Sequence, residues 1–148
     1  MTRSQRLDPL LRVTQQRQDS VAKQLAERDK ALTEQQQRLD LLQQYADTYT
    51  PAPAGSTLAP AMLANHLAFR AKLDVALQQQ SRAVDTSRQA CDVERARLML
   101  ASRDNKVLEQ LAAAYRSEET RVAGQREQRE LDDLGGRRAR AAREEGES

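Results

Sequence analysis

The stretch that decides the fold runs from Pro60 to Leu134 and reads PAMLANHLAFRAKLDVALQQQSRAVDTSRQACDVERARLMLASRDNKVLEQLAAAYRSEETRVAGQREQRELDDL. It has no proline after Pro60 and one glycine, Gly124. A mixed apolar and polar seam recurs in it at alternating steps of three and four: Leu63, His66, Arg70, Leu73, Leu77, Gln80, Val84, Ser87, Cys91, Glu94, Leu98, Ala101, Asn105, Leu108, Ala112, Tyr115, Glu119 and Val122. This is the heptad repeat of a coiled coil, without the two-residue alternation of a strand. One helix of this length would span about 110 Å at about 1.5 Å per residue, so the pattern predicts a partner helix.

A second heptad seam precedes this stretch: Leu11, Thr14, Gln18, Val21, Leu25, Arg28, Leu32, Gln35, Leu39, Leu42, Ala46 and Tyr49. Asp8 and Pro9 suit the start of its helix, as a capping residue and a first helical residue. Residues 50–60 hold three prolines and a glycine, which a helix cannot continue. The two seams therefore predict an all-α fold, an antiparallel two-helix coiled coil (αα-hairpin) with a longer C-terminal helix.

The predicted boundaries describe a single coiled-coil domain over residues 1–148. Helix 1 covers about 8–49, the turn about 50–59 and helix 2 about 60–134, and a disordered tail follows over about 135–148 because Gly135-Gly136 and a run of charges come next. With the turn near Gly55, Thr14 should face Leu98 to within about one helical turn.

This register leaves the end of helix 2 without a partner in the chain. Helix 1 would end opposite about residue 104, so a set of apolar side chains beyond that point would lie on a lone helix: Leu108, Leu111, Tyr115 and Val122. A frayed, solvated helix, a docking element for another protein and self-association are all compatible with this pattern.

Composition restricts the class of protein. The 148 residues include 3% aromatics and 31% charged residues, and 24 basic against 22 acidic side chains leave a formal net charge of +2. A nucleic-acid-binding chain would have a larger basic excess. One cysteine excludes an internal disulfide, and neither a secretory signal nor an apolar run of about 20 residues is present. We expect a soluble, cytoplasmic chain with no nucleic-acid partner.

Catalytic and metal motifs are missing from the sequence. There is no phosphate-binding G-x-x-x-x-G-K-[ST] loop, no H-E-x-x-H pair and no pair of cysteines. His66 is the lone histidine and is expected to line the seam near the turn, while Cys91 is expected to be a small buried side chain. The sequence therefore predicts no enzyme, catalytic residue, cofactor, metal or small-molecule ligand.

Three of the four aromatic residues gather beside the predicted turn. Leu42, Tyr45 and Tyr49 form one stripe at helical spacing, and Phe69, Leu73 and Ala76 form another. Aromatic side chains beside the seam of a thin helical pair are typical anchors of a protein interface. They could also simply thicken the packing near the turn.

These residues resemble the FliJ family of the bacterial flagellar type III export apparatus. The resemblance is carried by LDPLL at 7–11, EQQQRL at 34–39, LQQYADTY at 42–49 and FRAKLDVAL at 69–77, together with the lengths of the helices. It implies an antiparallel coiled coil similar to the F1 γ-subunit stalk of rotary ATPases. It also implies a non-catalytic protein that binds the export ATPase FliI, the export-gate protein FlhA and other export chaperones, peripherally associated with the inner membrane.

The resemblance assigns a partner to each end of the predicted hairpin. The gate-binding face would be Leu42, Tyr45, Tyr49, Phe69, Leu73 and Ala76. Arg38 and Gln80 stand where the family can have glutamine and histidine, so two positions of that face depart from the pattern. The ATPase-binding residues would be Leu108, Leu111, Tyr115 and Val122. A stalk of a virulence type III secretion system and a generic coiled-coil scaffold are the alternatives.

Overall fold

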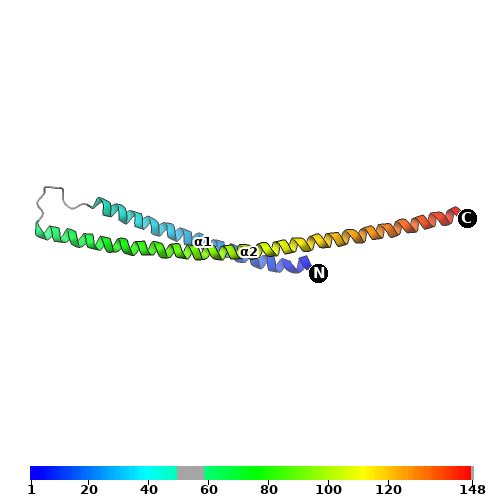
Figure 1. Cartoon of the computed structure of the whole chain (residues 1–148), viewed down its shortest axis with the longest axis horizontal. Helices are drawn as coiled ribbons and strands as arrows, with labels where there is room; N and C mark the ends of the chain where they lie inside the picture. The colour runs from blue at the N-terminus through cyan, green and yellow to red at the C-terminus, as the bar shows by residue number, and fades with distance from the viewer. Residues whose placement is uncertain (50–58, 148) are drawn as a thin grey trace. The chain divides into compact units, whose positions relative to one another are not determined.

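Two helices account for the fold. The structure is a computed structural model that describes residues 1–49 and 59–147, and it contains α1 (Arg3–Thr48) and α2 (Pro60–Glu147), coloured by residue number in Figure 1. These described residues contain no strand. The predicted turn lies, apart from Ala59, outside them. The all-α prediction is confirmed.

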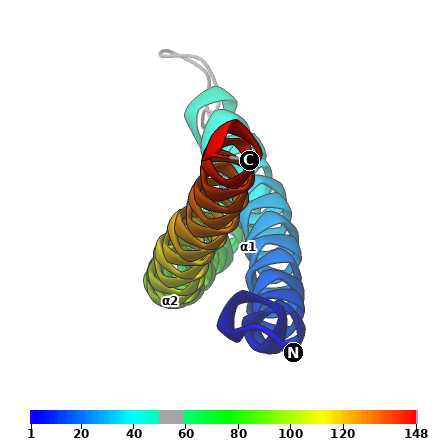
Figure 2. The same ribbon diagram turned by 90° about the vertical axis from the view of Figure 1, so that its right-hand side faces the viewer.

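The chain forms two compact units, each with a segment of both helices. Unit 1 comprises Met1–Gln16 with Ser102–Ser148, and unit 2 comprises Arg17–Ala101. The α1 and α2 segments of unit 2 lie side by side in the views of Figure 1 and Figure 2. The prediction of a single domain stays a prediction.

Contacts between the helices show that the pairing is antiparallel in both units. In unit 2, Tyr49 is hydrogen-bonded to His66 and Gln35 to Gln80, and Asp29 forms an ion pair with Arg95. The residue number of the α2 partner therefore rises as the residue number of its N-terminal partner falls. In unit 1, Thr14 is bonded to Asn105 and Ser4 to Glu119. The predicted antiparallel two-helix coiled coil is thus confirmed.

The predicted seam of α2 is the buried side of each unit. From Leu73 to Glu119 every seam residue is buried or half-buried, and the apolar core includes Leu73, Val84, Cys91, Ala101 and Ala112. On α1 the seam holds with one exception, because Arg28 is exposed and Asp29 is half-buried in its place. A period of 3.5 residues thus predicts burial well in both helices.

The predicted register needs a correction that grows away from the turn. Gln80 is bonded to Gln35 where the prediction places residue 77, and Asn105 is bonded to Thr14 where it places Leu98. The first error is within one helical turn and the second is about two turns. An offset of three residues is already present where the helices meet, since Tyr49, just after α1, bonds to His66, six residues into α2, rather than to the first turn of α2.

Helix α1 begins at Arg3, five residues before the predicted start at Asp8. The reason is a capping box at Thr2, whose Oγ1 accepts the Gln5 N–H at 3.3 Å while the Gln5 Oε1 accepts the Thr2 N–H at 3.0 Å. Pro9 consequently lies inside the helix, where its missing N–H leaves the Gln5 carbonyl without a helical donor. The cap and contacts with α2 offset this loss.

Helix α2 begins at Pro60, in the first helical position that suits proline. It continues to Glu147, so the predicted end at Leu134 and the predicted disorder of residues 135–147 are corrected. Gly135 and Gly136 cost about 1 kcal/mol each in a helix, and the alanine- and arginine-rich sequence after them favours helix strongly enough to continue it. Every residue from 121 to 147 is exposed.

Candidate functional site

An aromatic cluster lies in unit 2 where α1 ends and α2 begins. It consists of Tyr45, Tyr49, His66 and Phe69. The Tyr49 ring centroid is 4.7 Å from that of Phe69, and Tyr45 and Phe69 meet edge to face at 6.2 Å. The Tyr49 hydroxyl is hydrogen-bonded to His66 Nδ1 at 2.7 Å. The structure therefore joins the three predicted aromatics and adds His66, which lines the seam near the turn as predicted.

Arg70 holds the last turn of α1 against α2 beside this cluster. Its guanidinium donates to the Ala46 carbonyl at 2.9 Å and pairs with Asp74 at 3.5 Å. A carbonyl in the last turn of a helix lacks a helical donor, so the arginine satisfies it from the other helix. The aromatic rings are thus carried on two helical segments that are fixed to one another.

The six residues predicted to bind the gate differ in what they offer a partner. Tyr45 is 52% exposed and Phe69 is 38% exposed, and these two rings form the accessible part of the face. Leu42, Tyr49 and Ala76 are half-buried. Leu73 is 6% exposed and belongs to the core, so it offers a partner little surface, and its place on the predicted face stays a prediction. A seam position points toward the other helix, which is why Leu73 packs inside.

Sequence reasoning missed an apolar extension of this face on α2. Met62 and Leu67 are exposed, and Leu63, which the heptad places on the seam, is exposed as well. Two open hollows of about 330 and 390 Å³ lie beside His66 and Tyr49; Leu63 and Leu67 line the first, and Met62 and Phe69 line the second. The offset register was the missing signal, because it leaves the first turns of α2 without α1 opposite them.

The four residues predicted to bind the ATPase lie in unit 1, and their predicted lack of a partner is corrected for two of them. Leu108 and Tyr115 are half-buried, because α1 starts early enough to reach Glu119, whereas Leu111 is 38% exposed. The Arg3 guanidinium lies 5.7 Å from the centroid of the Tyr115 ring. Val122 remains exposed, on the rim of an open hollow that Thr2 and Arg3 share.

Ser4 and Glu119 form what we call the N-terminal clasp. The Glu119 carboxylate accepts the Ser4 N–H at 3.0 Å and the Ser4 hydroxyl at 2.7 Å. It thereby satisfies an otherwise free N–H of the first turn of α1 and places a negative charge at the positive end of the helix. Hydrogen bonds from the Ser4 side chain and backbone lower the pKa of Glu119.

Lowering the pH should release the clasp in the wild-type chain, and replacing Glu119 should abolish this pH dependence. Because the folded pKa is lowered, the contribution to stability is complete above the ordinary glutamate pKa of about 4.3 and is lost as the pH falls through the lowered pKa. We expect the NMR shift of the Ser4 amide proton to titrate with an apparent pKa below about 4.3 in the wild-type chain, and not to titrate in Glu119→Gln.

The neighbouring carboxylate is the matched control for this experiment. Glu118 pairs with Arg121 within α2, which lowers its pKa as well, but it has no bond to α1 in the described residues. Glu118→Gln should leave the Ser4 titration unchanged. A Ser4 amide that titrates at the ordinary glutamate pKa would show that the clasp is absent in solution.

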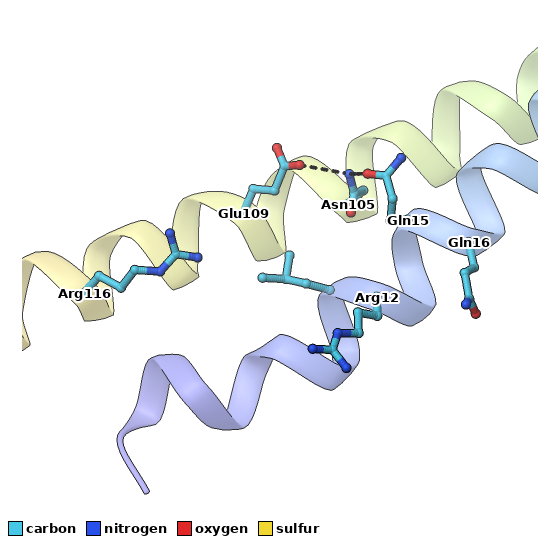
Figure 3. A pocket seen from close by; sticks show the side chains of 7 residues that line it. Arg12, Gln15, Gln16, Asn105, Glu109 and Arg116 are labelled. Atoms are coloured by element: carbon cyan, nitrogen blue, oxygen red, sulfur yellow. Dashed lines mark hydrogen bonds between the residues drawn. The ribbon is translucent and has the colours of Figure 1, made fainter.

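Asn105 anchors a polar layer in the core of unit 1. Its Oδ1 accepts the Thr14 hydroxyl at 2.9 Å, and its Nδ2 donates to Gln15 Oε1 at 3.0 Å and to Glu109 Oε1 at 3.2 Å. Figure 3 shows the last two bonds. A buried amide with these partners penalises any shift of one helix along the other, so the layer favours a single register.

A hollow of about 600 Å³ opens beside this layer in unit 1. It is lined by Leu11, Arg12, Gln15, Gln16, Asn105, Glu109 and Arg116. Figure 3 shows Arg12 on α1 and Arg116 on α2 at its edges. The hollow is open to solvent. Its lining offers guanidinium donors and one carboxylate, but no nucleophile beside a base, so it is not arranged for catalysis.

Unit 2 has a buried polar layer of its own. Cys91 is fully buried as predicted, and burial together with a hydrogen bond to Asp29 raises the pKa of its thiol. Glu94 is 5% exposed; Arg97 donates to its Oε1 at 3.1 Å, but its buried Oε2 has no hydrogen-bond partner. A protonated, enclosed thiol is a poor nucleophile.

The described residues hold neither a metal-binding group of side chains nor a membrane-spanning helix. They contain no group of three or more histidine, cysteine, aspartate or glutamate side chains placed to hold a metal ion. Among those same residues, no helix is long and apolar enough to cross a bilayer.

Comparison with known proteins gives one result. The family model described as "Flagellar FliJ protein" matches residues 3–144, which is nearly the whole chain. No curated protein and no solved structure matches the chain.

Proposed function

The chain belongs to the flagellar FliJ protein family, which associates it with flagellar protein export, and we propose that it is a non-enzymatic stalk and chaperone of that apparatus. In this proposal it links the export ATPase FliI to the export-gate protein FlhA, receives other export chaperones, and works on the cytoplasmic side of the inner membrane. It carries no cofactor.

The observation that supports this proposal best is the aromatic cluster of unit 2. Two large rings, Tyr45 and Phe69, are exposed on helices that Arg70 ties together. Exposed aromatic side chains on a rigid support are the usual anchors of a protein interface, because they bury a large area at a small loss of conformational freedom. The family resemblance assigns the cluster to the gate and unit 1 to the ATPase, and the exposed rings support the first assignment.

The deciding experiment removes both accessible rings. We expect Tyr45→Ala with Phe69→Ala to weaken binding to the purified cytoplasmic domain of FlhA by about thirtyfold or more, since each interface anchor is worth about 1–2 kcal/mol or more. The same variant should stimulate ATP turnover by FliI as the wild type does, because neither residue belongs to unit 1. Calorimetry measures the first effect and phosphate release the second.

Leu41→Ala provides the control, because Leu41 is an exposed leucine of α1 outside the aromatic cluster. It should leave gate binding within about twofold of the wild type. Far-UV circular dichroism must show retained helicity in the double variant. Unchanged gate binding in a helical double variant would remove the cluster from the proposal, and absence of any ATPase stimulation by the wild type would remove the link to FliI.

A further inference from the structure

We propose that the hollow of unit 1 between Arg12 and Arg116, here called the arginine groove, binds an acidic helical segment of a partner protein. The groove lies outside the aromatic cluster, and its recognition chemistry is electrostatic rather than aromatic. The identification of that partner with the ATPase rests on the proposed function, whereas the chemistry of the groove does not.

The two arginines are available because nothing in the described chain neutralises them. Neither Arg12 nor Arg116 has an ion pair among the described residues, although each lines the same hollow from a different helix. Figure 3 shows their guanidinium groups at the edges of the hollow. A guanidinium is always charged and presents a planar fork of donors that fits a carboxylate.

Hydrogen bonds within the chain engage three carboxylates of unit 1. Glu119 is held by Ser4, Glu118 by Arg121, and Glu109, which lines the groove, accepts from Asn105. The lining of the groove holds two guanidinium groups, Arg12 and Arg116, against one carboxylate, Glu109. The uncompensated charge is therefore positive, and complementarity favours a negatively charged occupant.

The shape of the groove favours a helix over an isolated anion. The half-buried Leu11 lines the hollow together with the arginines, and the hollow of about 600 Å³ is lined by residues of both helices. A third helix can set an apolar side chain against Leu11 and carboxylates, two turns apart, against the arginines. We therefore assign an acidic helix with an apolar residue between its carboxylates.

A defined peptide tests this chemistry without any natural partner. The probe is a fluorescein-labelled synthetic helix of about 18 residues with Glu at i and i+7 and Leu at i+4, on the same face, long enough to be partly helical alone. Its fluorescence anisotropy is followed as the full-length chain is added. We expect binding that weakens with added salt, and loss of at least about tenfold in affinity in Arg12→Ala/Arg116→Ala.

Two controls separate the groove from net charge alone. Arg38→Ala/Arg82→Ala makes the same charge change in unit 2, where neither side chain has an ion pair among the described residues, and should change the affinity by less than about twofold. A probe with every Glu replaced by Gln should not bind. Equal losses in both double variants, or binding of the Gln probe, would overturn the proposal.

The same titration with duplex DNA and with anionic vesicles distinguishes other classes of partner. If either binds more tightly than the acidic peptide and depends on the same two arginines, the groove serves that class and the proposal is wrong. Failure of the peptide to bind would refute the groove while leaving FlhA binding and ATPase stimulation untouched. Unchanged gate binding in Tyr45→Ala with Phe69→Ala would refute the proposed function while leaving peptide binding intact.

Discussion

Glu94→Leu should raise the free energy of unfolding by about 2–3 kcal/mol. The carboxylate is 5% exposed and its Oε2 has no hydrogen-bond partner among the described residues, so folding removes the carboxylate from water with Arg97 as its ion-pair partner. Leucine in this seam position buries apolar surface instead. A buried ionic group often costs more in desolvation than it returns, and its replacement by an apolar residue then stabilises the fold.

This effect is measured as the thermal midpoint by far-UV circular dichroism, where we expect a rise of roughly 5–10 °C. Glu27→Leu is the matched control: Glu27 lines the same open hollow as Glu94 but is exposed, so the same substitution should change the midpoint little. A midpoint that falls in Glu94→Leu would mean that the Glu94 carboxylate is well solvated or well paired in solution.

Leu73→Ala should destabilise the chain by about 2–5 kcal/mol. Leu73 is 6% exposed, and truncating a core leucine loses its transfer free energy and leaves a cavity that neighbouring side chains fill only in part. Urea unfolding followed by circular dichroism provides the measurement. Leu67→Ala is the matched control, since Leu67 is 64% exposed on the same helix and should cost less than about 0.5 kcal/mol.

The same pair of variants distinguishes a core role from a binding role for Leu73. Any loss of gate affinity in Leu73→Ala should follow the loss of helicity and should recover on cooling below the lowered midpoint. A loss of affinity at full helicity would place Leu73 on the binding face. If Leu73→Ala lowers the free energy of unfolding no more than Leu67→Ala does, neighbouring side chains fill the space left by the truncated leucine completely.

The heptad period was sufficient to predict the buried side of both helices and the gathering of Tyr45, Tyr49 and Phe69. These features depend on residues a few positions apart, whose geometry in a helix is known in advance. Leu73 shows the limit of this reasoning, because helical spacing alone placed it both on the seam and on the binding face. Its burial confirms the seam position.

Several of the remaining differences involve contacts between residues far apart in sequence. The start of α1 at Arg3 depends on Glu119, a carboxylate 115 residues away that bonds to Ser4. No local sequence pattern indicates such a distant partner. The Thr2–Gln5 capping box, in contrast, is a local pattern from which the earlier start of α1 could have been predicted. The register depends on how Tyr49 meets His66, which helix periods do not specify. The arginine groove likewise arises only when Arg12 and Arg116 are brought together.

Burial of Cys91 makes the natural chain a ready background for site-directed labelling. Thiol-reactive dyes and spin labels attack the thiolate, and the Cys91 sulfur is enclosed, with a raised pKa. A cysteine introduced at an exposed position such as Val75 can therefore carry a probe without prior removal of the native one. Spectroscopic distances and binding can then be followed in a chain whose core sequence is unaltered.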